Sequence, residues 1–197
     1  MSTSTHLLFL AGSARADSIN KKLAHVAAGI ADANGIAATF VDLGDYPMPL
    51  YDGDMEQSDG VPDNAKKLHA LFSAHSGIFI ASPEYNASIT PLLKNTLDWV
   101  SRVKSDNVAP LEVYKTRIFM IASAAPGNFG GIRGLIALRH ILSTGLGALV
   151  LPDQLAIPKA AEAFDHEGRL QDIPNLERLK FLVQKLAQAS KALHGEE

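Results

Sequence analysis

The chain has 197 residues, 47% of them hydrophobic, which is enough to bury a full core, and we expect one domain over residues 1–197. A formal net charge of −3 gives no broad basic field, which argues against nucleic acid as a partner. The absence of cysteine excludes a disulfide, a thiolate nucleophile and a cysteine-held metal, so any redox chemistry needs a borrowed cofactor.

The first residues are polar and lack a basic start followed by an apolar run. No later stretch reaches the ~18 apolar residues of a membrane span. We therefore expect a cytoplasmic protein that binds small molecules and does not associate with a membrane.

Short apolar runs in chain order have the length and flanks of buried parallel strands: residues 7–11, 38–41, 77–81, 117–123 and, more weakly, 147–151. Segments with helical spacing alternate with them. This order predicts an α/β fold, a doubly wound parallel sheet with helices on both faces and right-handed crossovers. Ligands of such sheets lie beyond the carboxyl ends of the strands.

Three further segments complete the prediction. A helix is expected over residues 18–33, directly after the first strand. Residues 44–60 are rich in Asp, Pro and Tyr without a helix or strand period, which is typical of a long surface loop. Pro174 is expected to open the last helix, whose leucines form one apolar stripe that packs on the core.

Residues 12–20, with the sequence GSARADSIN, join the first strand to the first helix and gather hydrogen-bond donors. Hydroxyls, a guanidinium, an amide and the free N–H groups of a helix start are what a phosphate monoester needs. The donors are Ser13, Arg15, Ser18 and Asn20. The alternative is that Asp17 or Ser18 merely caps the helix and Arg15 is a solvated charge.

The sequence lacks the motifs of several other kinds of site. The chain has neither G-x-x-x-x-G-K-[ST] nor, in its first loop, G-x-G-x-x-G, so the loop suits the terminal phosphate of a mononucleotide. None of the seven histidines is spaced as H-x-x-x-H, and we expect no metal site. The motif G-x-S-x-G of serine hydrolases is absent.

A second polar stretch, SPEYNAS, follows the run at 77–81 and begins at Ser82. With GSARADSIN it resembles the NAD(P)H-dependent FMN reductase family, which includes bacterial quinone and chromate reductases: the first loop matches that family's GSxRxxSxN, and residues 83–99 are similar to its PEYN segment and continuation. One departure is Ile89-Thr90-Pro91, where many members have Pro-Gly.

The resemblance implies a flavodoxin-like fold, with five parallel strands in the order 2-1-3-4-5. It implies FMN at the ends of the first, third and fourth strands, and a homodimer or homotetramer whose interface borders the flavin. The activity implied is hydride transfer from NAD(P)H to bound FMN and then reduction of a second acceptor, such as a quinone, free flavin, an azo compound or chromate. No side chain is assigned as a catalytic acid or base.

The resemblance also assigns site residues by position. The phosphate would be held by Ser13, Arg15, Ser18, Ile19 and Asn20. The isoalloxazine, which needs a flat apolar wall and fixed donors, would lie along Pro83, Glu84, Tyr85 and Asn86. The other side would be closed by Ser123 and Gly130. A plain strand-end turn remains the alternative for the second stretch.

Some residues keep two interpretations. Arg133 either approaches the flavin or the NADPH phosphate, or forms an ion pair between subunits. Trp99 is expected in the core or an interface, and Lys94 with Asp98 as an i, i+4 pair. At the level of function, the alternative to an enzyme is a flavodoxin-like electron carrier or flavin-binding interaction protein that turns over no small substrate.

Overall fold

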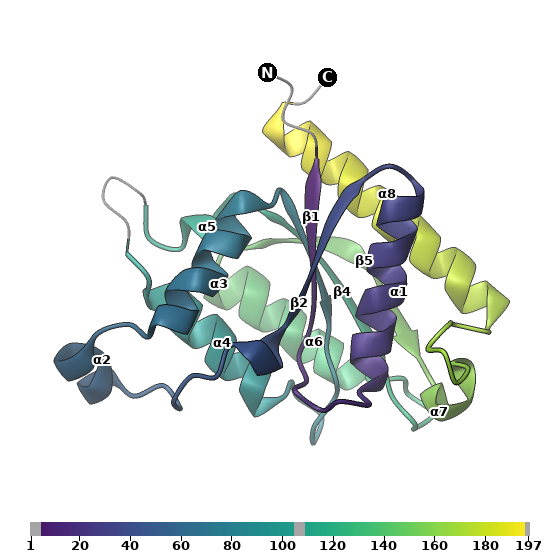
Figure 1. Ribbon diagram of the computed structural model, residues 1–197, viewed down its shortest axis with the longest axis horizontal. Helices are drawn as coiled ribbons and strands as arrows, with labels where there is room; N and C mark the ends of the chain where they lie inside the picture. The colour runs from purple at the N-terminus through teal and green to yellow at the C-terminus, as the bar shows by residue number, and fades with distance from the viewer. Residues whose placement is uncertain (1–4, 105–108, 196–197) are drawn as a thin grey trace.

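A computed structural model describes residues 5–104 and 109–195. Its five strands form one sheet in the order β2-β1-β3-β4-β5, and all four neighbouring pairs are parallel, which confirms the predicted topology (Figure 1). The strands are β1 His6–Ala11, β2 Ala37–Asp42, β3 Gly77–Ala81, β4 Ile118–Ala124 and β5 Leu149–Ile157. The strand predicted at 147–151 thus begins at Leu149 and continues to Ile157.

The helices alternate with the strands as expected. They are α1 Ile19–Ala33, α2 Gly53–Asp59, α3 Asp63–Ala74, α4 Pro91–Arg102, α5 Glu112–Lys115, α6 Ile132–His140, α7 Ala160–Ala163 and α8 Ile173–His194. A 3-10 turn, Leu43–Asp45, follows β2, and a π turn, Ile141–Gly145, follows α6. Within the described ranges, no helix is long and apolar enough to cross a membrane.

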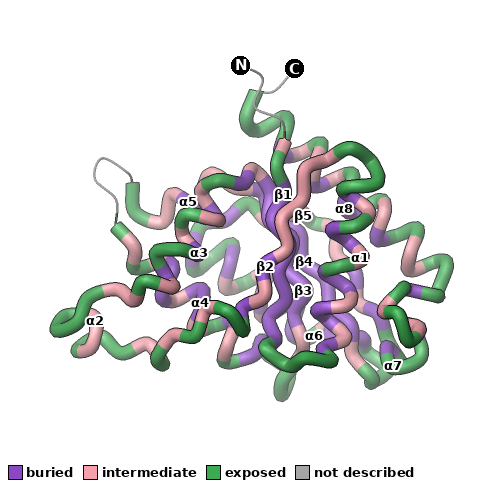
Figure 2. The backbone as a smooth tube through the Cα atoms, in the orientation of Figure 1, coloured by how far each residue is buried: buried purple, intermediate pink, exposed green. Residues whose placement is uncertain are grey.

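Both faces of the sheet are covered, because successive side chains of a strand point to opposite sides. In β1, Leu7 and Phe9 pack with α1 and α8, whereas Leu8 and Leu10 pack with α3, α4 and α6 (Figure 1). The central strands β1, β3 and β4 are consequently buried almost throughout, whereas the edge strands β2 and β5 are mostly only partly buried (Figure 2). This two-sided burial explains why β1, β3 and β4 are continuous apolar runs in the sequence.

The long loop predicted over residues 44–60 is wrong in part, since it contains the end of the 3-10 turn and all of α2. The side chain of Asp52 caps α2 by accepting from the N–H groups of Asp54 and Met55, at 2.8 and 3.2 Å. No residue of α2 is buried. A helix without a buried face leaves no apolar period in the sequence, which is why the pattern did not indicate it.

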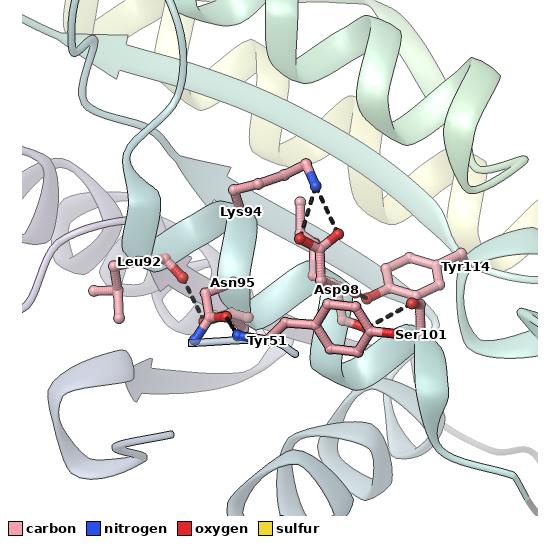
Figure 3. A network of polar contacts seen from close by, with 9 residues as sticks. Tyr51, Leu92, Lys94, Asn95, Asp98, Ser101 and Tyr114 are labelled. Atoms are coloured by element: carbon pink, nitrogen blue, oxygen red, sulfur yellow. Dashed lines mark hydrogen bonds and ion pairs between the residues drawn. The ribbon is translucent and has the colours of Figure 1, made fainter. Parts of the chain in front are cut away.

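The segment before α2 is fixed to α4 (Figure 3). The Pro49 carbonyl accepts from Asn95 Nδ2 at 2.9 Å and from Trp99 Nε1 at 2.7 Å. Asn95 Oδ1 accepts from the Tyr51 N–H at 2.8 Å. Trp99 is fully buried, so its place is in the core. The predicted pair between Lys94 and Asp98 is present at 2.7 Å (Figure 3).

Candidate active site

The loops that follow β1, β3 and β4 meet at the carboxyl edge of the sheet, where the strand order reverses between β1 and β3. They enclose a cavity of about 130 Å³. Its walls contain eight of the predicted positions: Ser13, Arg15, Ser18, Ile19, Asn20, Pro83, Glu84 and Tyr85. The remaining wall residues, Ala124, Ala125 and Pro126, were missed because they are apolar and carry no chemical signal beyond their place after β4.

The first loop presents unused donors to this cavity. The Oγ of Ser13 accepts from the Arg15 N–H at 3.3 Å, and the Oγ of Ser18 caps α1 by accepting from the Lys21 N–H at 3.4 Å. Neither hydroxyl hydrogen has an acceptor in the described part of the chain, and the same is true of the N–H groups of Ile19 and Asn20. The capping role of Ser18 is therefore compatible with ligand binding.

The electrostatics of the first loop favour an anion. The first turn of α1 contains no acidic residue that would repel an anion from the positive end of the helix dipole. Arg15 is exposed beside it and adds a guanidinium, the side chain best suited to bidentate phosphate contacts.

Asn20 joins the first loop to the end of β4. Its Nδ2 donates to the Ala124 carbonyl at 2.9 Å and its Oδ1 accepts from the Ala124 N–H at 3.0 Å, both in the interior. One amide hydrogen is left for a ligand. Asn20 therefore holds two walls of the cavity together.

Thr90 joins the first loop to α4. Its hydroxyl donates to the Gly12 carbonyl at 2.6 Å and accepts from the Leu93 N–H at 3.1 Å, as the cap of α4. The Gly12 N–H donates to the Ala81 carbonyl at the end of β3, at 2.9 Å. Residues 12 and 90 thus fix the spacing between the β1 and β3 loops.

The second stretch folds into a tight hairpin turn. Tyr85 and Ser88 exchange main-chain hydrogen bonds of 2.9 and 3.0 Å, while Asn86 and Ala87 adopt positive φ angles of 49° and 64°. An alanine in this region carries strain of about 1 kcal/mol or more. Tyr85 lines the cavity with 48% of its surface exposed, whereas Asn86, at the tip of the turn, does not line it.

Glu84 is held by the start of α6. Its side chain is only 8% exposed; Oε2 accepts from the Gly134 N–H at 3.0 Å, and Oε1 forms an ion pair with Arg133. Burial alone would raise the pKa of Glu84, but the hydrogen bonds from Gly134 and Arg133 outweigh it and lower the pKa. Arg133 thus has a partner in its own chain, and a pair between subunits stays a prediction.

Ser123 and Gly130, two further predicted site residues, do not line the cavity, and Gly130 lies against the main chain of residues 156–158 at the end of β5. Gly131 has a φ of 88°, and a Cβ there would lie 1.9 Å from the Ser123 Oγ, so only glycine permits this approach. The Ser123 hydroxyl is fully buried, and among the described residues it has no hydrogen-bond partner. It is a spare donor one residue before Ala124 of the cavity wall.

Larger hollows, of about 610 and 580 Å³, lie at the other end of α4. They share His69, Arg102 and Lys104 and contain none of the predicted site residues. Across residues 5–104 and 109–195, no cluster of His, Asp and Glu is arranged to hold a metal ion. The convergence of donors therefore selects the cavity of about 130 Å³, and a hollow of about 420 Å³ next to it shares Ser13, Arg15 and Tyr85.

Comparison with known proteins decides the family. The profile described as NADPH-dependent FMN reductase matches residues 5–162. The chain belongs to this family. It is 33% identical to the quinone reductase of Escherichia coli K12 over 142 residues, which are 72% of this chain and 71% of the relative. It is 30% identical to the NAD(P)H-dependent FMN reductase of Pseudomonas aeruginosa over 190 residues, 96% and 95% of the two chains.

Solved structures agree on the fold. FerB, a flavoenzyme NAD(P)H:(acceptor) oxidoreductase from Paracoccus denitrificans, superposes with a TM-score of 0.78, covering 95% of this chain and 98% of FerB at 23% identity. The chain thus has the flavodoxin-like architecture expected of the family.

The donor set fits the family's cofactor. A cradle of two hydroxyls, two helix N–H groups and a guanidinium suits the phosphate of FMN. The apolar residues Ala124, Ala125 and Pro126 and the ring of Tyr85 give the same cavity a surface against which a flat ring can lie.

Proposed function

We propose that this protein is an FMN-dependent NAD(P)H oxidoreductase that reduces a small-molecule acceptor, and that a quinone is the acceptor best supported. The observation that carries the proposal is the set of unused donors around Ser13 and Ser18, next to the loop after β3. The relatives named quinone reductase support the acceptor class.

When bound, FMN would take a hydride from NAD(P)H and return two electrons to the acceptor. The overall reaction is NAD(P)H plus H⁺ plus quinone giving NAD(P)⁺ plus hydroquinone, which balances two electrons and two protons.

The first loop would hold the phosphate. The hydroxyls of Ser13 and Ser18 and the N–H groups of Ile19 and Asn20 would donate to its oxygens, and Arg15 would neutralise its charge. The positive end of the α1 dipole, whose first turn has no acidic residue, would add to this attraction. With the phosphate held in this way, the flavin ring would lie against the loops after β3 and β4.

Pro83 and Tyr85 would form the wall for the ring, and residues 124–126 the facing edge. The hairpin bonds between Tyr85 and Ser88 limit motion of this wall. Fixed walls orient a flat ring against an incoming nicotinamide, which is where the protein contributes to rate.

Glu84 is not suited to donate a proton to the acceptor. The titratable wall residues are Arg15, Glu84 and Tyr85. Glu84 is ion-paired with a lowered pKa, so it stays ionised at neutral pH. We assign no side chain as an obligate acid or base, and the chain acts by positioning and electrostatics.

We also propose that the protein works in the cytoplasm as a homodimer or homotetramer. Phe129, just before α6, and Ile136, within it, expose 67% and 63% of their surfaces, as residues of a subunit interface would. Light scattering of the purified protein measures the assembly.

The experiment that tests the activity is steady-state oxidation of NAD(P)H by purified, FMN-loaded protein, with and without a benzoquinone. We expect turnover that depends on the quinone. If the protein binds FMN but supports turnover with no quinone, azo compound, chromate or free flavin, it is an electron carrier.

A further inference from the structure

The carboxylate of Glu84 is a buried charge at the edge of the cavity. Its side chain is 8% exposed and belongs to a residue that lines the cavity. A buried carboxylate is costly unless it is paired and hydrogen-bonded. The hydrogen bond and the ion pair that stabilise the Glu84 carboxylate both come from one helix, α6.

The two compensating contacts are of different kinds. The main-chain N–H of Gly134 fixes the position of the carboxylate, and a Cβ at this glycine would lie 3.2 Å from the Glu84 Cβ, so the helix and the loop are in close contact. Arg133 supplies the opposite charge from a side chain that is 58% exposed. Its guanidinium also lies over the Phe129 ring, 5.6 Å from the centroid.

We propose that Glu84 and Arg133 form a charge-compensated pair whose two charges act in opposite directions on the reduction potential of FMN in this site, so that neither charge alone shifts it. The inference rests on the proposed function. Two-electron reduction makes a flavin more negative, so an uncompensated carboxylate at the cavity would oppose it and an uncompensated guanidinium would favour it. The intact pair cancels most of both effects.

The competing explanation is that the pair only fastens the loop after β3 to α6. Loss of either partner would then loosen the loop and weaken FMN binding, but the charge that remains would not matter. The two explanations differ in the sign of one measurable quantity, the shift in potential.

The experiment uses full-length Glu84→Gln, Arg133→Gln and the double variant, each loaded with FMN. Glutamine at position 84 keeps an oxygen that accepts from the Gly134 N–H, so this variant changes charge more than contacts. Fluorescence titration gives the dissociation constant of oxidised FMN, and equilibration with a reference dye gives the reduction potential.

We expect shifts of opposite sign. Glu84→Gln raises the affinity for reduced relative to oxidised FMN, and Arg133→Gln lowers it, by about threefold to tenfold. Tenfold corresponds to about 30 mV for a two-electron couple. The Arg133 variant shows the larger shift, because the remaining carboxylate is buried whereas a freed guanidinium is screened by solvent. The double variant returns to within about threefold of the wild type.

The matched control is Lys94→Gln, which also removes one cation from an ion pair but lies on the surface of α4, outside the cavity walls. Its potential should equal that of the wild type. Should Glu84→Gln fail to fold, two further variants at position 133 test the proposal. Arg133→Lys should keep the wild-type reduction potential, and Arg133→Glu should lower the potential further than Arg133→Gln does.

Shifts of the same sign in both single variants, or no shift while FMN stays bound, would overturn the proposal and leave the oxidoreductase function intact. Failure of the wild type to bind FMN would contradict both the oxidoreductase function and the proposed role of the pair.

Discussion

The amide of Asn20 and the main chain of Ala124 form two hydrogen bonds in opposite directions, of 2.9 and 3.0 Å, across 104 residues of sequence. This contact joins the start of α1 to the end of β4. Because both residues are buried, water cannot replace either partner in these two hydrogen bonds.

Asn20→Ala should therefore lower both stability and cofactor affinity. Leaving a buried N–H and a buried carbonyl unsatisfied costs about 2–4 kcal/mol of unfolding free energy. Urea unfolding of the FMN-free protein measures it. Asn34→Ala, which removes an exposed side-chain bond to Ile30 at the other end of α1, serves as the control and should cost under about 1 kcal/mol.

Arg15→Ala should weaken FMN binding by about 1.5–3 kcal/mol, the contribution of a charge-assisted hydrogen bond. The unfolding free energy of the FMN-free protein should barely change, since this side chain is exposed. Fluorescence titration with FMN is the measurement, and Arg15→Lys should fall between the two proteins because it loses the bidentate geometry. Equal FMN affinity in all three would show that Arg15 is only a solvated charge.

Gly131→Ala should destabilise the protein by about 2–4 kcal/mol, because the new Cβ meets the buried Ser123 hydroxyl and the φ of 88° disfavours alanine. Gly127→Ala is the matched variant in the same loop, with open space around its Cβ. It should be neutral within about 0.5 kcal/mol. Thermal unfolding of the two variants side by side checks this, and similar melting temperatures would contradict it.

Ala87→Gly should stabilise the protein by up to about 1 kcal/mol, since glycine adopts a φ of 64° without strain. The same change at Ala70, on the exposed face of α3, should destabilise by about 1 kcal/mol. Denaturation midpoints that move in the same direction for both variants would refute strain in the turn.

Stability should fall as the solution is acidified below about pH 6.5, partly through His75. Burial lowers the pKa of this imidazole, which contacts the Leu71 carbonyl at 2.6 Å and the Thr39 hydroxyl at 2.8 Å. The unfolded chain then binds a proton before the folded one does, so the stabilisation is complete above the unfolded pKa and is lost as the pH falls toward the folded pKa. His75→Gln should show a shallower slope of unfolding free energy between pH 7 and 5.5.

Features that depend on neighbouring residues in the sequence were predictable, and contacts between distant residues were not. The strands and the first loop were predictable because buried runs and donors such as Ser13 and Ser18 are local in the sequence. The contact of Asn20 with Ala124 has no local signature, and α2 buries nothing that would give it a period. The role of α6 in holding Glu84 depends on a main-chain N–H, which no residue type reveals.

The Thr90 hydroxyl, which contacts the Gly12 carbonyl and the Leu93 N–H, ties the β1 and β3 loops together through contacts within the chain itself. The β1 and β3 loops then lose little conformational entropy on binding, so more of the contact energy appears as affinity. We therefore expect FMN to bind to a preorganised site, with little folding coupled to binding.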